Sequence, residues 1–136
     1  IGKASIVKQG SDVVVFATGG LVQESLIASD ILQKESISTT IVNISTLKPL
    51  DETLIINETK RHNAVIVAED HNVIGGLNDA VCRTLTKHQI SVPFKSIAVR
   101  DQFAETGSGP ELYEKYGLSA NHVIKAIKDL LTLKKV

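Results

Sequence analysis

The chain has few features that would cross-link it or tether it to a membrane. It has one cysteine, Cys82, and no apolar run near the roughly 20 residues needed to cross a bilayer. A single cysteine cannot form an internal disulfide, so the sequence fits a reducing compartment, the cytosol. No segment resembles a signal peptide, and neither CxxC nor HExxH occurs, so no metal site is visible.

The charge balance also excludes two classes of partner. The chain carries 15 basic and 15 acidic residues, so its formal net charge is zero. No long-range field therefore favours nucleic acid or an anionic membrane. Methionine is absent and the chain starts at Ile1, so we expect a piece of a longer protein. The length of 136 residues suits a single domain, 1–136, with a sizeable core.

Short apolar runs alternate with helical patterns, which predicts βαβ units and a mostly parallel sheet with both faces covered. The continuous runs Val13 to Ala17 and Ala64 to Ala68 are typical of buried parallel strands. Other strands are expected at Ala4 to Val7, Thr39 to Ile44 and within Val92 to Val99. Helices are expected from Leu21 to Lys34, from Pro49 to near Lys60, around Leu77 to Leu85, over Glu111 to Tyr116, and from Ser119 onward.

A glycine turn, Ala17-Thr18-Gly19-Gly20, joins a predicted strand to a predicted helix. Backbone N–H groups at such a helix start could hold a phosphate. The stretch is neither GxGxxG nor a P-loop, however, and it has no lysine at the Walker position. We favour the structural interpretation, in which two glycines permit a tight turn.

Glu69, Asp70 and His71 follow the apolar run that ends at Ala68. A carboxylate beside an imidazole is suited to general acid–base catalysis. No serine or cysteine nucleophile in a recognisable elbow accompanies them. We therefore favour a loop whose polar side chains satisfy backbone groups or contact another domain.

The next helix is preceded by Gly75-Gly76, and we expect at least one of these glycines to have a positive φ. Arg100 follows the last predicted strand and could meet an anion, pair with Asp101 or contact a neighbouring domain. Cys82 is interpreted as a small buried residue rather than a nucleophile. The scattered His62, His88 and His122 have no metal-ligand spacing, and each is interpreted as a surface residue.

Taken together, these segments resemble the C-terminal domain of transketolases. The resemblance rests on four stretches in the family's order: IGKASIVKQGSDVVVFATGG, TTIVNISTLKPLDETLI, VAEDHNVIGGLNDAV and DQFAETGSGPELYEKYGLSANHVIKA. The same domain type occurs in deoxyxylulose-phosphate synthases and in β subunits of 2-oxo acid dehydrogenases. The EDH and TGSGPELYEKYGL stretches are more similar to transketolase. Asn78 departs from the family's usual Gly-Gly-Leu-Gly.

The resemblance implies a three-layer α/β/α domain with a five-stranded, mostly parallel sheet in the order 1-3-2-4-5, strand 1 being antiparallel. The loops after strands 2 and 4 would then flank the point where the strand order reverses, where ligands bind in open α/β sheets. The candidate switch-point or interface residues are Thr18, Gly19, Gly20, Glu69, Asp70, His71, Gly75, Gly76 and Arg100.

The resemblance also implies an enzyme that transfers a two-carbon ketol unit between sugar phosphates. In the resembling enzymes, other domains bind thiamine diphosphate and its divalent metal, such as Mg²⁺, and the Gly-Asp-Gly metal motif is absent here. We therefore expect no catalytic, cofactor or metal residue in this chain, and no activity from it alone. Its expected partners are the thiamine-diphosphate-binding domains or subunit, in a homodimer or a split heterotetramer.

Three alternatives remain open at this point. Two are the corresponding domains of a 2-oxo acid dehydrogenase β subunit and of a deoxyxylulose-phosphate synthase. The third is a regulatory module that binds a metabolite at the switch point of the sheet.

Overall fold

The structure is a computed structural model that describes residues 2–72, 76–99 and 119–134. Its strands are β1 (Ser5–Lys8), β2 (Val13–Ala17), β3 (Thr39–Asn43), β4 (Ala64–Asn72) and β5 (Phe94–Val99). Its helices are α1 (Gly20–Gln33), α2 (Glu52–Lys60), α3 (Leu77–Lys87) and α5 (Ala120–Lys134). The predicted helix over Glu111 to Tyr116 lies outside the described residues.

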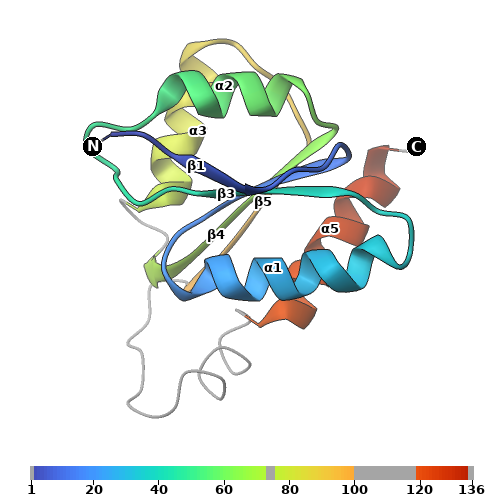
Figure 1. Cartoon of the computed structure of the whole chain (residues 1–136). Helices are drawn as coiled ribbons and strands as arrows, with labels where there is room; N and C mark the ends of the chain where they lie inside the picture. The colour runs from blue at the N-terminus through green and yellow to red at the C-terminus, as the bar shows by residue number, and fades with distance from the viewer. Residues whose placement is uncertain (1, 73–75, 100–118, 135–136) are drawn as a thin grey trace.

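The strands form one sheet in the order β1-β3-β2-β4-β5, which confirms the predicted order (Figure 1). β1 pairs with β3 in the antiparallel sense, whereas β2 pairs in parallel with both β3 and β4. β4 and β5 are also parallel. The strand order reverses between β2 and β4, so the segments that follow these two strands start next to each other.

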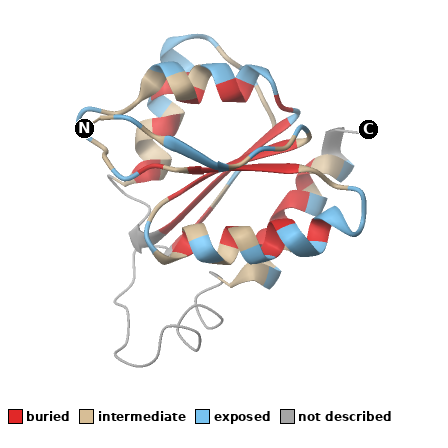
Figure 2. Ribbon diagram, in the orientation of Figure 1, coloured by how far each residue is buried: buried red, intermediate tan, exposed pale blue. Residues whose placement is uncertain are grey.

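Helices cover both faces of the sheet: α1 and α5 lie on one face, and α2 and α3 on the other (Figure 1). Val13 and Val15 of β2 belong to the apolar cluster on the α1/α5 face, whereas Val14 and Phe16 belong to the cluster on the α2/α3 face. All four side chains are fully buried. Figure 2 shows the buried class concentrated on the strands in the middle of the sheet and on the sides of the helices that face it. This two-sided burial explains the uninterrupted apolar run, and each buried side chain contributes roughly 1.5–3 kcal/mol of transfer free energy.

Asp51 joins helix α2 to the segment just before β1. Its Oδ1 accepts a hydrogen bond from the backbone N–H of Leu54 at 3.3 Å and so caps α2. Its Oδ2 accepts from the backbone N–H of Ala4 at 2.9 Å. The carboxylate that caps α2 therefore also anchors the chain just before β1.

Two features differ from the predictions made from the sequence, and one prediction stays open. β4 continues to Asn72, so Glu69, Asp70 and His71 belong to a strand and not to a loop. Gly76 has φ −96° and Gly75 lies outside the described residues, so the statement that at least one of these two glycines has a positive φ stays a prediction. His62 is only 8% exposed and is not a surface residue.

Candidate functional site

Glu69 lies at the carboxyl side of the buried part of β4, and it holds the start of α3. Its Oε1 accepts a hydrogen bond from the backbone N–H of Leu77 at 3.0 Å, and its Oε2 accepts from that of Asn78 at 2.7 Å. The residue is 1% exposed. The first N–H groups of a helix have no partner within the helix, and the helix dipole favours an anion there. Glu69 therefore acts as a cap supplied from a different element.

Glu69 caps α3 because the residue at the N-cap position cannot do so. The N-cap residue of α3 is Gly76, which offers no side-chain oxygen. A strand extended beyond Ala68 brings the Glu69 carboxylate to the helix end. Both oxygens are thereby engaged with backbone groups, which argues against Glu69 as a proton-transfer residue.

Asn78, the departure from the family pattern, lies in the first turn of α3. Its backbone N–H donates to Glu69, and its Oδ1 lies 3.9 Å from Cys82 Sγ. Burial and, to a smaller extent, the Asp79 carboxylate raise the pKa of the Cys82 thiol. Since the thiolate is the nucleophilic form, these surroundings disfavour a reactive role for Cys82. The residue is only half-buried, less than the sequence predicted.

The Thr18-Gly19-Gly20 turn lies beside this capped segment. The backbone N–H of Thr18 donates to the carbonyl of Ala68 at 3.1 Å, which links the ends of β2 and β4. Gly19 has φ 58° and ψ −138° and is the N-cap of α1, so its left-handed φ supports the tight-turn interpretation. The Thr18 Oγ1 is buried and has no hydrogen-bond partner within the described part of the chain.

The predicted switch-point residues are thus only partly placed together. Thr18 is joined to Ala68, the neighbour of Glu69, and Gly76 adjoins the helix that Glu69 caps. Asp70 and His71 lie in β4, but the structure does not describe their side chains. Gly75 and Arg100 lie outside the described residues. The roles of these residues stay predictions.

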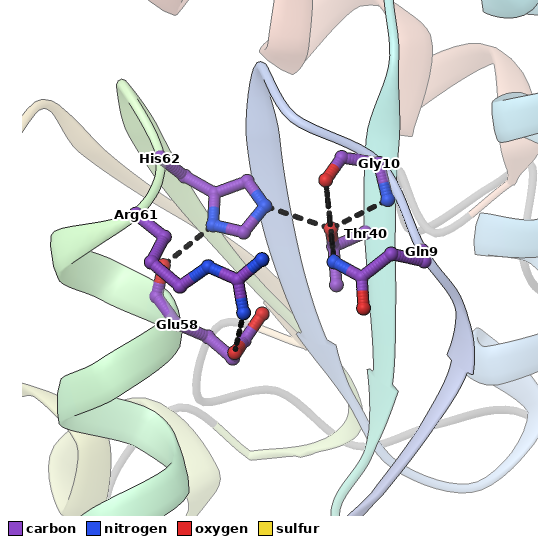
Figure 3. A network of polar contacts seen from close by, with 6 residues as sticks. All are labelled: Gln9, Gly10, Thr40, Glu58, Arg61 and His62. Carbon is purple, nitrogen blue, oxygen red and sulfur yellow. Dashed lines mark hydrogen bonds and ion pairs between the residues drawn. The ribbon is translucent and has the colours of Figure 1, made fainter.

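The sequence did not predict a buried polar network at the opposite, amino-terminal edge of the strands (Figure 3). His62 Nδ1 lies 2.5 Å from the backbone oxygen of Glu58, and its Nε2 lies 2.7 Å from Thr40 Oγ1. The same hydroxyl accepts from the backbone N–H of Gly10 at 2.8 Å. Because a carbonyl only accepts, Nδ1 donates its hydrogen to the Glu58 carbonyl. The Thr40 hydroxyl has one hydrogen, and both the Gly10 carbonyl oxygen, at 3.0 Å, and His62 Nε2 lie within hydrogen-bond distance of it.

This hydrogen-bond network joins three segments of the chain to one another. Gly10 belongs to the turn between β1 and β2, Thr40 to β3, and His62 follows α2. A Cβ added at Gly10 would lie 2.3 Å from the backbone oxygen of Thr39, so the backbones approach too closely for any side chain. In the sequence, Gly10 before Ser11-Asp12 indicates a turn, but residue spacing does not show that Thr40 and His62 lie next to it.

Across residues 2–72, 76–99 and 119–134, no group of three or more His, Cys, Asp or Glu side chains could hold a metal ion. In the same ranges, no helix has the length and apolar character required to span a membrane.

The fold and sequence place the chain in a family. The family described as transketolase, C-terminal domain, matches residues 2–123, and the chain belongs to it. A solved structure titled split gene transketolase, inactive beta4 tetramer, is similar with a TM-score of 0.88 and 37% identity. The match covers 98% of this chain and 43% of that chain.

Curated relatives show the same relationship. The 6-deoxy-6-sulfo-D-fructose transketolase subunit SqwH of Clostridium sp. (strain MSTE9) is 37% identical, over 96% of this chain and 40% of that protein. The putative transketolase C-terminal section of Methanocaldococcus jannaschii is 36% identical, over 95% of this chain and 40% of that protein. The 1-deoxy-D-xylulose-5-phosphate synthase of Syntrophotalea carbinolica is 37% identical, over 96% of this chain and 21% of that protein. The chain therefore spans at most about two fifths of these three relatives.

Proposed function

We propose that residues 1–136 form the C-terminal domain of a transketolase that transfers a two-carbon ketol unit between sugar phosphates in the cytoplasm. In this proposal, thiamine diphosphate and its divalent metal are bound by other domains or by a separate subunit. The domain stabilises that assembly and supplies no catalytic residue. The names of the Clostridium subunit and of the Methanocaldococcus C-terminal section support a split enzyme with two kinds of chain.

The hydrogen bonds of Glu69 are the observation that supports a structural and not a catalytic role for this domain. Its carboxylate is buried, and both oxygens accept backbone hydrogen bonds at the start of α3. A general acid or base must reach a substrate proton, directly or through one water. The Glu69 carboxylate instead holds strand β4 and helix α3 together.

Reconstitution tests the proposal. The thiamine-diphosphate-binding part of the same enzyme is prepared with and without residues 1–136, and ketol transfer, cofactor retention and sedimentation are measured. We expect activity only from the combination, and a smaller or cofactor-poor assembly without this domain. Calorimetric titration of the 136-residue chain alone with thiamine diphosphate and magnesium should show no binding. Micromolar binding there would contradict the assignment of the cofactor to other domains.

Deoxyxylulose-phosphate synthase is the second candidate because the Syntrophotalea synthase is as similar to the chain, at 37% identity, as the Clostridium transketolase subunit. The product distinguishes the two. The reconstituted enzyme should exchange ketol groups between sugar phosphates without forming 1-deoxy-D-xylulose 5-phosphate. Formation of that compound as the main product would replace the transketolase assignment and leave the supporting role of the domain intact.

A further inference from the structure

A cleft of about 420 Å³ opens between the segment after β3 and the outer side of α3. Leu47, Leu50 and Ala80 give it an apolar part, and each of them is half-buried. This volume is within the range of small-molecule sites, which combine apolar walls with a few polar groups. The cleft therefore has the size and the mixed lining of a site for a small metabolite.

The charges around the cleft are unbalanced. Lys48, Arg83 and Lys87 line it together with a single carboxylate, Glu52. Lys87 Nζ lies 3.0 Å from Glu52 Oε1, so these two charges offset each other. Lys48 and Arg83 are exposed and form no ion pair with any residue that the structure describes. Two positive charges therefore remain at one concave place in a chain whose net charge is zero.

The cleft lies at the edge of the sheet where ligands are expected. The residues Leu47 to Leu50 follow the carboxyl end of β3, and Gly76 precedes α3. In open α/β sheets, ligands bind outside the carboxyl ends of the strands. The cleft is nevertheless displaced from the predicted switch point, because Gly76 is the one member of that set, among those that the structure describes, that lines it.

The side chains, and not the helix start, would hold an anion in the cleft. The backbone N–H groups of Leu77 and Asn78 are already bonded to Glu69. Arg83 offers a guanidinium fork that matches two oxygens of a phosphate, and Lys48 offers a point charge. Lys48 and Arg83 line the same cleft, and an anion bound between two cations offsets the repulsion between them.

We propose that this cleft binds a small phosphate monoester, with the phosphate between Lys48 and Arg83 and the carbon body against Leu47, Leu50 and Ala80. A phosphate monoester carries nearly two negative charges at pH 7, which matches the two unpaired cations. A monocarboxylate would leave one of them unbalanced. The site is separate from the ketol-transfer chemistry proposed above, and it uses residues of this chain alone.

The test is calorimetric titration of the complete protein that contains this chain, and in parallel of the 136-residue chain, with glycerol 3-phosphate, inorganic phosphate and glycerol. Glycerol 3-phosphate should bind saturably, inorganic phosphate more weakly, and glycerol not at all. Arg83→Gln and Lys48→Gln should each weaken binding about tenfold, as expected for the loss of one charge-assisted hydrogen bond. Ala80→Leu, which fills the apolar part without changing charge, should also weaken glycerol 3-phosphate binding.

Lys60→Gln is the matched control, because Lys60 is an exposed lysine on α2 that does not line the cleft. It should bind glycerol 3-phosphate as the unmodified protein does. Unchanged binding in Arg83→Gln and Lys48→Gln, or no saturable binding of either phosphate compound, overturns the proposal. If these two variants instead weaken association with the cofactor-binding part, the cations hold an acidic group of that partner and the metabolite site is wrong.

Discussion

The Glu69 carboxylate of β4 accepts a hydrogen bond from the backbone N–H of Asn78 in α3, with Oε2 and N 2.7 Å apart. These two residues belong to the stretch VAEDHNVIGGLNDAV, whose acids and histidine are of the types that acid–base catalysis uses. The distance shows that at least one of its acids has a structural task. A stretch with a recognisable signature can therefore encode the junction between a strand and a helix.

Glu69→Ala should lower the free energy of unfolding by about 1–3 kcal/mol, since it leaves the Leu77 and Asn78 N–H groups without their buried acceptor. Glu69→Gln keeps one acceptor oxygen and should lose less. Urea unfolding of the two variants against the unmodified chain measures both effects. An alanine variant as stable as the unmodified chain would show that water or another group caps α3 equally well.

Thr40→Val tests the buried network of Figure 3. It preserves the shape of the side chain but leaves His62 Nε2 and the Gly10 N–H without the hydroxyl that they share. We expect a loss of about 1–3 kcal/mol in the free energy of unfolding. Thr40→Ser keeps the hydroxyl and is the control, with a smaller loss. Equal losses in both variants would attribute the effect to the missing methyl group and not to the network.

Gly10→Ala should destabilise the chain by more than about 1 kcal/mol, because the new Cβ would lie 2.3 Å from a backbone oxygen of β3 that a central strand cannot move aside. Ser11→Ala, one residue further along the same turn, is exposed and should change stability little. Thermal unfolding of the two variants gives the comparison. Similar melting temperatures would show that the turn can shift away from Thr39.

Two helix ends use a residue where glycine is usual. Ser36, with φ 63°, and Gln89, with φ 57°, adopt left-handed backbone after α1 and α3, and the residues that follow them bond back to Leu32 and Leu85. Glycine has no Cβ penalty in this conformation. Ser36→Gly and Gln89→Gly should therefore each raise the free energy of unfolding by about 0.5–1 kcal/mol. Ser36→Ala, which keeps the penalty, should give no such gain in urea unfolding.

Both apolar faces could be anticipated because they depend on local patterns, whereas the sheet order was implied by the resemblance to the transketolase C-terminal domain. The runs Val13 to Ala17 and Ala64 to Ala68 are buried on both sides, as their composition indicated. The sequence predicted a loop at Glu69, although β4 continues through it. A run of polar residues after an apolar strand has the same local pattern whether or not the strand goes on pairing with its neighbours. Its bonds to α3 span eight and nine positions and depend on how the strand and the helix pack.

For the same reason, the sequence predicted neither the burial of His62 nor the cleft. His62 is buried by contacts with Glu58, four residues away, and with Thr40, 22 residues away on another element. Lys48 and Arg83 share a cleft although they are distant in sequence. Spacing along one element shows what a helix or strand presents on one face, but it does not show which distant side chains gather between elements.

Cys82 provides a prediction about pH. Burial, and secondarily the negative charge of Asp79, disfavour the thiolate and raise the thiol pKa. At neutral pH, alkylation by iodoacetamide should therefore be slower than that of an unstructured cysteine peptide, and it should accelerate as the pH rises through the raised pKa. Asp79→Asn removes the charge, so it should lower the pKa and shift the rate profile to lower pH. Rates followed by mass spectrometry across the pH range test this, with Asp129→Asn on α5 as a charge-matched control that should leave the profile unchanged. A profile that Asp79→Asn does not move would leave burial as the sole cause, and one centred below that of the peptide would mark Cys82 as an activated thiol.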